Sequence, residues 1–287
     1  MMLKFGNINN SELIIKNTWC EFRNALKNKV FLFSETEKAK ELTFLKVFND
    51  LFFNNNGMEY LTVPLKSIKN NLMRGTKLDA NEVVNHERFL PKKEFIKSSN
   101  RFSPPGVEWL YLALETSTPA VETIKKEIRI ESNQRFGYCN FKLNDEFAES
   151  KIIDLTISND YTYECFNLEL NRDLTNSANE IIRREKQKGK VPIKGQKFFG
   201  SNERNMIKRW AVFTYCKLLS EQIFIPIETV DTELEYAPFQ TIAQYFISLG
   251  YSGIIYKSTV SKGGKNMVLF DKAMAAPFGI IKEEIIQ

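Results

Sequence analysis

The chain has 287 residues, of which 43% are hydrophobic and 26% are charged, and its formal net charge is +5. This length allows one large domain or two small ones with a substantial core, and the composition is typical of a folded globular protein. Apolar runs stay well short of the roughly 18 residues of a membrane span and the start lacks the layout of a signal peptide, so we expect a cytoplasmic protein.

Residues that bind metals are scarce. His86 is the only histidine, and the four cysteines (Cys20, Cys139, Cys165 and Cys216) are widely spaced without a CxxC pair. We therefore expect no metal site and no disulfide framework, and a Ser-His-Asp triad would depend on one histidine. The lysines are spread along the chain, so the basic charge only weakly indicates binding to polyanions.

Residues 1–65 are predicted to form a helical N-terminal segment. Ser34 followed by Glu37 fits a capping box, and an apolar helical stripe follows at Leu42, Leu45, Phe48 and Phe52. We expect the segment to be part of the core or an oligomer surface, with docking of an inhibitory partner as the alternative. Residues 66–287 then form the main domain. A short strand is predicted at LTVPL, and LMRG is predicted to be another strand end or a turn.

The signals become clearer from Arg101 onward. Pro104-Pro105-Gly106 predicts a turn, and a buried strand over 109–113 follows it and carries Tyr111. Thr118 is suited to be the N-cap of a helix with Pro119 in its first position. Glu122 then lies in the opening turn, where the helix dipole favours a carboxylate.

The rest of the chain alternates irregularly between strands and helices. Strands are predicted at 136–142 and 151–155, and helices at 175–188, 203–219 and about 238–249, the last ended by Gly250. Two final strands, 253–257 and 266–271, are joined by a loop that contains Ser258 and a hairpin turn at Gly263-Gly264. This order of elements predicts an α+β fold.

Two motifs resemble the RES domain family, which is named for an Arg, a Glu and a Ser. In RFSPPGVEWLYLALETSTPAVE, the residues Arg101, Tyr111 and Glu122 match the family's first motif in order. In YAPFQTIAQYFISLGYSGIIYKSTVSKGGKNMVLF, Ser258 is at the position of the family serine. Arg74 in LMRG matches an earlier arginine on a less distinctive motif. The resemblance covers about residues 70–275, with 157–235 unaligned.

The resemblance implies an ADP-ribosyltransferase-like fold, with a mixed or antiparallel sheet surrounded by helices. It also implies a toxin that degrades NAD at the nicotinamide–ribose bond, by hydrolysis or by phosphorolysis. NAD is then the substrate, inorganic phosphate is the co-substrate in the second case, and no metal is required. A neighbouring antitoxin that plugs the NAD pocket is the partner that the family suggests, and a homo-oligomer stays open.

The residue types suit that reaction. Glu122 is expected to stabilise the oxocarbenium-like ribose, and Arg101 to hold the pyrophosphate bidentately. Tyr111 is expected to stack on the cationic nicotinamide ring, and Ser258 to bind a phosphate oxygen or the carboxamide. Arg74 is a further NAD contact, and Gln240 a supporting residue. Ser258 is expected to lack an adjacent base and therefore not to be a nucleophile.

Other interpretations stay open. Each residue also has a plain structural role, such as a surface ion pair for Arg101, a core aromatic for Tyr111 and a turn residue for Ser258. A protein ADP-ribosyltransferase would use the same residues with a protein acceptor. A basic nucleic-acid-binding module is the less favoured alternative, suggested by segments such as FIKSSNRF.

Overall fold

The computed structural model describes residues 8–28, 35–50, 57–157, 163–189, 205–206, 209–217 and 232–286. Its first elements are the helices α1 (Ile8–Lys27), α2 (Thr36–Glu41) and α3 (Thr43–Asn49), which lie in the segment predicted to be helical, whereas a short strand at Thr62–Pro64 also falls within the predicted bounds 1–65. Ser34 and Phe52 lie outside the described residues. Helix α2 has Glu35 at its N-cap position, without a capping hydrogen bond from that side chain.

An eight-stranded sheet forms the centre of the described structure, in the order β1-β5-β6-β7-β3-β2-β4-β8. Strands β5 and β6 are parallel and the other neighbours are antiparallel. The predicted α+β class is therefore confirmed. The strands are β1 (Thr62–Pro64), β2 (Leu72–Leu78), β3 (Leu110–Leu114), β4 (Arg135–Leu143), β5 (Lys151–Asp154), β6 (Gly253–Lys257), β7 (Lys265–Leu269) and β8 (Ala275–Ile285).

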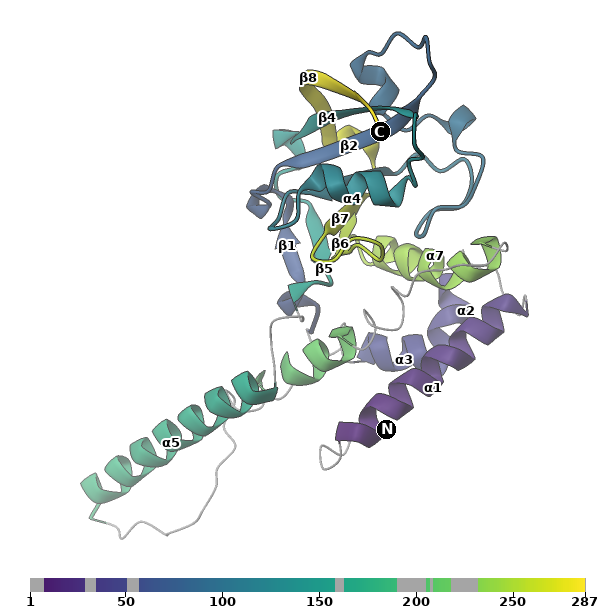
Figure 1. The fold of residues 1–287 in the computed structure, drawn as a ribbon. Helices are drawn as coiled ribbons and strands as arrows, with labels where there is room; N and C mark the ends of the chain where they lie inside the picture. Colours follow the sequence, from purple (N-terminus) through teal and green to yellow (C-terminus); the bar gives the residue numbers. More distant parts are fainter. Residues whose placement is uncertain are drawn as a thin grey trace.

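The later helices are α4 (Ala120–Glu127), α5 (Tyr163–Gln187) and α7 (Thr232–Ser248). Helix α4 packs on β2 and β3, α7 lies beside β6, and α5 projects away from the rest of the molecule (Figure 1). None of the described helices is long and apolar enough to cross a lipid bilayer. Short 3₁₀ turns are formed by Gly57–Tyr60, Leu65–Ser67, His86–Phe89, Lys93–Phe95, Asp145–Phe147 and Lys272–Met274.

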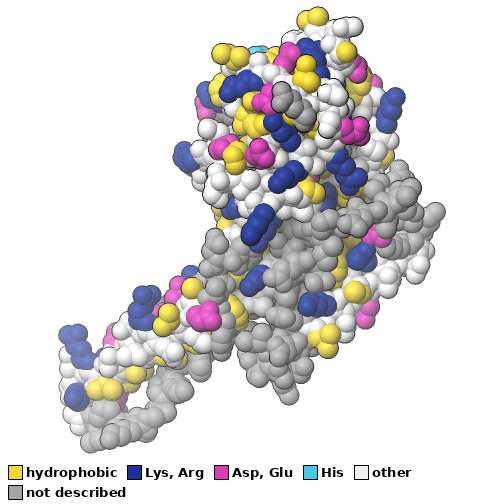
Figure 2. Space-filling model, in the orientation of Figure 1, with side chains coloured by type: hydrophobic (Ala, Val, Ile, Leu, Met, Phe, Trp, Pro, Cys, Tyr) yellow, Lys and Arg dark blue, Asp and Glu magenta, His cyan; other side chains and the backbone are white. Residues whose placement is uncertain are grey.

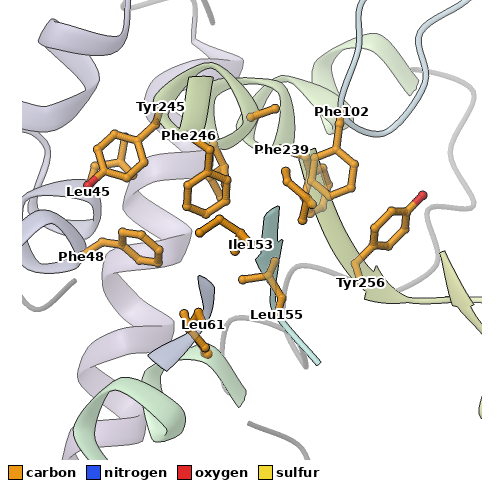
Figure 3. Close-up of a cluster of buried hydrophobic side chains, with 14 of the residues drawn as sticks. Leu45, Phe48, Leu61, Phe102, Ile153, Leu155, Phe239, Tyr245, Phe246 and Tyr256 are labelled. Atoms are coloured by element: carbon orange, nitrogen blue, oxygen red, sulfur yellow. The ribbon is translucent and has the colours of Figure 1, made fainter. Parts of the chain in front are cut away.

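The N-terminal helices share one aromatic core with the C-terminal part of the chain. Helix α1 packs against α3 and α7. Trp19 of α1 lies 5.0 Å from Phe44 of α3 between ring centroids, and Phe48 lies 5.7 Å from Tyr245 of α7. Figure 3 shows how this cluster extends to Tyr256 on β6. The early helices therefore help to place α7 and β6, the elements that lead into the Ser258 loop.

Several predicted details differ in the structure. Helix α4 begins at Ala120 with Pro119 at the N-cap position, so the prediction of Thr118 as N-cap is wrong. The Ala120 N–H instead donates to the Glu115 carboxylate at 3.0 Å. Helix α5 begins twelve residues earlier than expected, since it runs from Tyr163 and not from Thr175. Strand β8 was not predicted, because Pro277 and Gly279 interrupt a mostly exposed edge strand.

Candidate functional site

Hydrogen bonds join the loop between β6 and β7 to the residues just before α4 and to the middle of α4. The Thr118 hydroxyl donates to the Lys262 carbonyl at 2.8 Å, and the Thr116 hydroxyl donates to the Gly263 carbonyl at 3.1 Å. Within the helix, the Thr123 hydroxyl contacts Ser261 Oγ at 3.3 Å. A Cβ atom on Gly264 would lie 2.5 Å from Thr123 Oγ1, so this close approach needs glycine. The loop and the helix thus form one wall.

Glu127, the last residue of α4, faces this wall. Its Oε1 accepts a hydrogen bond from Ser258 Oγ at 2.7 Å and another from Asn266 Nδ2 at 2.8 Å. Within the described part of the chain, Glu127 Oε2 has no hydrogen-bond partner, and the Glu127 side chain is exposed. Two donors therefore fix the carboxylate while one oxygen stays accessible to a ligand.

Ser258 has a base beside it, which the sequence did not indicate. Besides donating to Glu127, its Oγ accepts hydrogen bonds from the backbone N–H groups of Val260 at 3.3 Å and Ser261 at 3.0 Å. The expectation that Ser258 lacks an adjacent base is wrong, because Glu127 comes from a helix far away in the sequence. The same contacts give Ser258 the turn-stabilising role that was its structural alternative.

A cavity of about 710 Å³ opens next to the Glu127–Ser258 pair. Lys257, Lys262 and Lys265 lie in its lining, which contains no acidic residue. The ammonium group of Lys265 donates to Thr156 Oγ1 at 2.9 Å, and Thr156 Oγ1 donates to Asp154 at 2.7 Å. A cavity with this excess of positive charge favours phosphate-bearing ligands. The full lining is Thr156, Lys257, Ser258, Thr259, Val260, Ser261, Lys262, Gly263, Gly264 and Lys265.

Glu122 lies in the first turn of α4, as predicted, but away from Ser258. Five residues separate it from Glu127, which turns the two side chains about 140° apart around the helix axis. Glu122 is exposed, and we find no hydrogen bond or ion pair to it from the residues that the structure describes. The structure therefore brings Ser258 to Glu127 and leaves Glu122 outside the cluster.

Arg101 does reach the Ser258 loop. Its Nη2 donates to Thr259 Oγ1 at 3.3 Å, and its guanidinium lies 5.1 Å from the ring centroid of Phe239 and 5.8 Å from that of Tyr236. Stacking on aromatic rings keeps a guanidinium oriented while it remains able to donate hydrogen bonds. Gln240 supports this segment, because its Nε2 donates to the carbonyl of Asn100 at 3.3 Å.

Tyr111 supports the turn that carries Arg101. Its hydroxyl accepts a hydrogen bond from the Phe102 N–H at 3.3 Å and contacts Ser103 Oγ at 3.0 Å. Burial raises the pKa of Tyr111 well above its usual range, so the hydroxyl stays protonated. The observed contacts of the Tyr111 hydroxyl are therefore with the backbone and side chain next to Arg101.

Arg74 lies on β2, opposite Cys139 of β4. Burial lowers the pKa of Arg74 to about 10, with the nearby Tyr111 acting in the opposite direction. Its buried Nη1 has no hydrogen-bond partner among the described residues. Burying a guanidinium nitrogen without a hydrogen-bond partner costs folding free energy, which favours a role for Arg74 in ligand binding. In the described structure, Arg74 makes no direct hydrogen bond to Glu127 or Ser258.

Three neighbours of Ser258 were not predicted as site residues: Glu127, Asn266 and Tyr256. The hydroxyl of Tyr256 points away from the aromatic cluster in Figure 3. Burial, and then the negative charge of Glu127, raise the pKa of Tyr256. Tyr256 and Asn266 both belong to the C-terminal motif quoted above, so their place in the motif was the available signal. Glu127 lies outside both quoted motifs, so no motif in the sequence indicated it.

Comparison with known proteins gives one family. The model of the RES domain matches residues 218–285, which include α7, β6, β7 and the whole of β8, together with Ser258. This match confirms the resemblance seen in the C-terminal motif. No curated protein matches the chain at a significant level.

Proposed function

We propose that this chain, whose residues 218–285 match the RES domain, is an enzyme that degrades NAD by cleaving its nicotinamide–ribose bond. The observation that carries the proposal is the Glu127 carboxylate. Two donors hold its Oε1, its Oε2 has no hydrogen-bond partner among the described residues, and the lysine-lined cavity lies beside it. The proposal includes an ADP-ribosyltransferase-like arrangement of the sheet around the NAD site.

The reaction needs an anionic group close to the ribose. When the C1′–N bond breaks, its electron pair passes to the nicotinamide nitrogen, neutral nicotinamide leaves, and the ribose becomes oxocarbenium-like. A fixed carboxylate stabilises that positive charge without having to reorganise during the reaction. We assign this role to Glu127, in place of the Glu122 expected from the sequence. The oxygen of water, with loss of a proton, or an oxygen of phosphate then bonds to this ribose carbon, which is C1″ in the product, and gives ADP-ribose or its 1″-phosphate.

The other site residues bind and orient NAD. Arg101, held by Thr259 and two aromatic rings, is suited to grip the pyrophosphate bidentately. Arg74 offers its Nη1, which has no hydrogen-bond partner in the described part of the chain, to a second phosphate oxygen or to the ribose. Ser258 orients Glu127, and Tyr111 keeps the Arg101 turn in place. Stacking of Tyr111 on the nicotinamide remains part of the proposal.

Two alternatives use the same surface differently. A protein ADP-ribosyltransferase would keep Glu127 and Arg101 and accept a protein side chain in place of water or phosphate. A nucleic-acid-binding module needs a contiguous basic surface. On the face drawn in Figure 2, Lys and Arg side chains are interspersed with Asp and Glu, which does not favour that alternative.

The biological setting follows from the proposed activity. An enzyme that depletes NAD acts as a toxin, and its cell of origin then needs an inhibitor. A neighbouring antitoxin protein that covers the cavity is the expected partner. This partner, a homo-oligomer and a cytoplasmic location stay predictions.

The experiment is to incubate the purified chain with NAD, with and without phosphate, and to follow nicotinamide by chromatography. Nicotinamide release together with free ADP-ribose indicates hydrolysis, and phosphate-dependent release with the 1″-phosphate indicates phosphorolysis. Release only when a cell extract is added, with ADP-ribose attached to a protein, would support the transferase. No loss of NAD under any of these conditions would contradict the proposal.

A further inference from the structure

Strand β8 contacts α4 through one carboxylate. Glu284 Oε2 of β8 accepts a hydrogen bond from Lys125 Nζ of α4 at 2.6 Å, and Glu284 Oε1 accepts one from the Tyr138 hydroxyl of β4 at 3.0 Å. Both oxygens of Glu284 are therefore used, one to hold the helix and one to fix Glu284 on the sheet. The Lys125–Glu284 pair links the edge of the sheet to the helix that ends at Glu127.

The two sides of α4 are held by different elements. Thr123 and Glu127 lie four residues apart, on the same side of the helix, and contact the loop and strand that carry Ser261, Ser258 and Asn266. Lys125 lies about 160° around the helix axis from Glu127, since two residues turn an α-helix by about 200°. The pair with Glu284 therefore acts from the side opposite the Ser258 loop.

The apolar contacts of this helix come from one small cluster, in which Met73, Val121, Ile128 and Ile130 are partly buried. Helix α4 has eight residues, and only Ala120, Thr123 and Ile124 of them are buried. Its apolar cluster on the sheet is small, with Ala113, Phe136 and Tyr138 as the other buried members. An eight-residue helix has little stability of its own, so its orientation depends on its tertiary contacts. The carboxylate at its last residue depends on the same contacts.

We propose that Lys125 and Glu284 are positioning residues, which set the rotation of α4 and thereby place the Glu127 carboxylate against Ser258. This inference rests on the proposed function only for the catalytic role of Glu127. Lys125 and Glu284 touch neither the lining of the cavity nor Ser258. Their effect on the reaction passes through the orientation of α4.

The test compares Lys125→Met, Glu284→Gln, the double variant and the charge swap Lys125→Glu/Glu284→Lys with the wild type. Lys126→Met is the matched control, because Lys126 is the exposed neighbour of Lys125 on the same helix. Each protein is assayed for kcat and KM with NAD, and hydrogen–deuterium exchange of a peptide spanning residues 120–127 is measured in parallel.

A misplaced reacting group can cost up to about 100-fold in rate, so we expect each single variant to lower kcat about 3- to 30-fold with KM within about twofold. The double variant should be no worse than the worse single one, because the two residues act as a pair. The charge swap should recover part of kcat. Exchange in α4 should be faster in the single variants and unchanged in Lys126→Met.

The two readouts separate this inference from the proposed function. A wild-type protein that releases no nicotinamide would contradict the proposed function, and the exchange data alone would then decide whether the pair orients α4. Exchange in α4 that stays at the wild-type level in Lys125→Met and Glu284→Gln would overturn the inference. Two further results would overturn it. One is a loss of kcat in the double variant equal to the product of the losses in the two single variants. The other is a charge-swap variant that recovers none of the lost kcat.

Discussion

Ser258 Oγ donates a 2.7 Å hydrogen bond to Glu127 Oε1 across a sequence separation of 131 residues. This bond joins the end of α4 to the residue that follows β6, and Asn266 on β7 adds a second donor to the same oxygen. The loop that lines the cavity and the helix that carries the carboxylate are therefore coupled. A change that moves the loop also moves Glu127.

Removing either donor should impair the reaction. A hydrogen bond to a charged group contributes about 1.5–3 kcal/mol, so Ser258→Ala and Asn266→Ala should each lower kcat roughly 10- to 100-fold. Nicotinamide release at saturating NAD measures this loss. Ser248→Ala, which removes a hydroxyl that bonds the Tyr245 carbonyl on α7, is the control and should keep kcat. Equal activity of Ser258→Ala and the control would argue against the coupling.

Arg74 should favour ligand binding at the expense of stability. Its buried guanidinium has a pKa lowered to about 10 and an Nη1 without a partner among the described residues. Because an uncompensated buried charge destabilises the folded state, Arg74→Met should leave Tm unchanged or raise it by a few degrees. The same variant should raise the KM for NAD at least about tenfold, since a bond to a charged ligand group is lost. A lower Tm with normal KM would assign Arg74 a structural role.

Tyr111→Phe tests how the Arg101 turn is held. The variant leaves the ring in place and removes the hydroxyl that contacts the Phe102 N–H and Ser103 Oγ. Unsatisfied groups left by such a change cost about 1–3 kcal/mol, and we expect a lower Tm together with a higher KM for NAD. Tyr60→Phe loses a longer bond of 3.4 Å to the Asn205 carbonyl and should leave KM unchanged. A lower Tm with an unchanged KM in Tyr111→Phe would separate Tyr111 from NAD binding.

The Glu284 contacts give the stability a defined dependence on pH. The hydrogen bond from Lys125, and then that from Tyr138, lower the pKa of Glu284 below its ordinary 4.5. The carboxylate therefore stabilises the folded state above its unfolded pKa, and this contribution is lost as the pH falls through the folded pKa. Glu284→Gln should reduce the free energy of unfolding by about 0.2–1 kcal/mol at pH 7, because the pair is partly exposed.

Urea unfolding of wild type and Glu284→Gln at pH 7 and below pH 4 measures that difference. The difference in the free energy of unfolding between wild type and Glu284→Gln should be smaller at the lower pH, because the wild-type carboxylate becomes protonated there. Glu59→Gln, at an exposed position, is the control and should show no gap at either pH. A gap that is constant with pH would contradict the assigned cause.

Strands β3 and β6 were predictable from the sequence because their apolar runs are short and bounded by turns, whereas the mixed sequence of β2 indicated only a strand end or a turn. Strand β6 has the predicted bounds, and β3 is shifted by one residue. Strand β8 was not predicted because it is an edge strand. Most of its side chains are exposed, so its sequence shows no alternation of apolar and polar residues. The contact between the N-terminal helices and α7 is a matter of tertiary packing, which periodicity does not encode.

The candidate site was predictable in part. The motif spacing located Arg101, Tyr111 and Ser258, and the structure connects Arg101 and Tyr111 to one turn and Arg101 to the residue after Ser258. The carboxylate partner of Ser258 depends on the rotation of α4. That rotation is set by contacts of Thr123 and Lys125 with residues far away in the sequence, so Glu122 and Glu127 could not be distinguished beforehand.

The catalytic role of Glu127 can be tested by measuring nicotinamide release from NAD by the wild type, Glu127→Gln and Glu122→Gln side by side. Both substitutions keep the size of the side chain and remove its charge. Because Glu127 contacts Ser258 and Asn266, and Glu122 is exposed on another side of α4, we expect at least about a hundredfold loss of activity for Glu127→Gln, in line with the loss of a key electrostatic group. Glu122→Gln should retain wild-type activity. The reverse result, with Glu122→Gln inactive and Glu127→Gln active, would contradict the account.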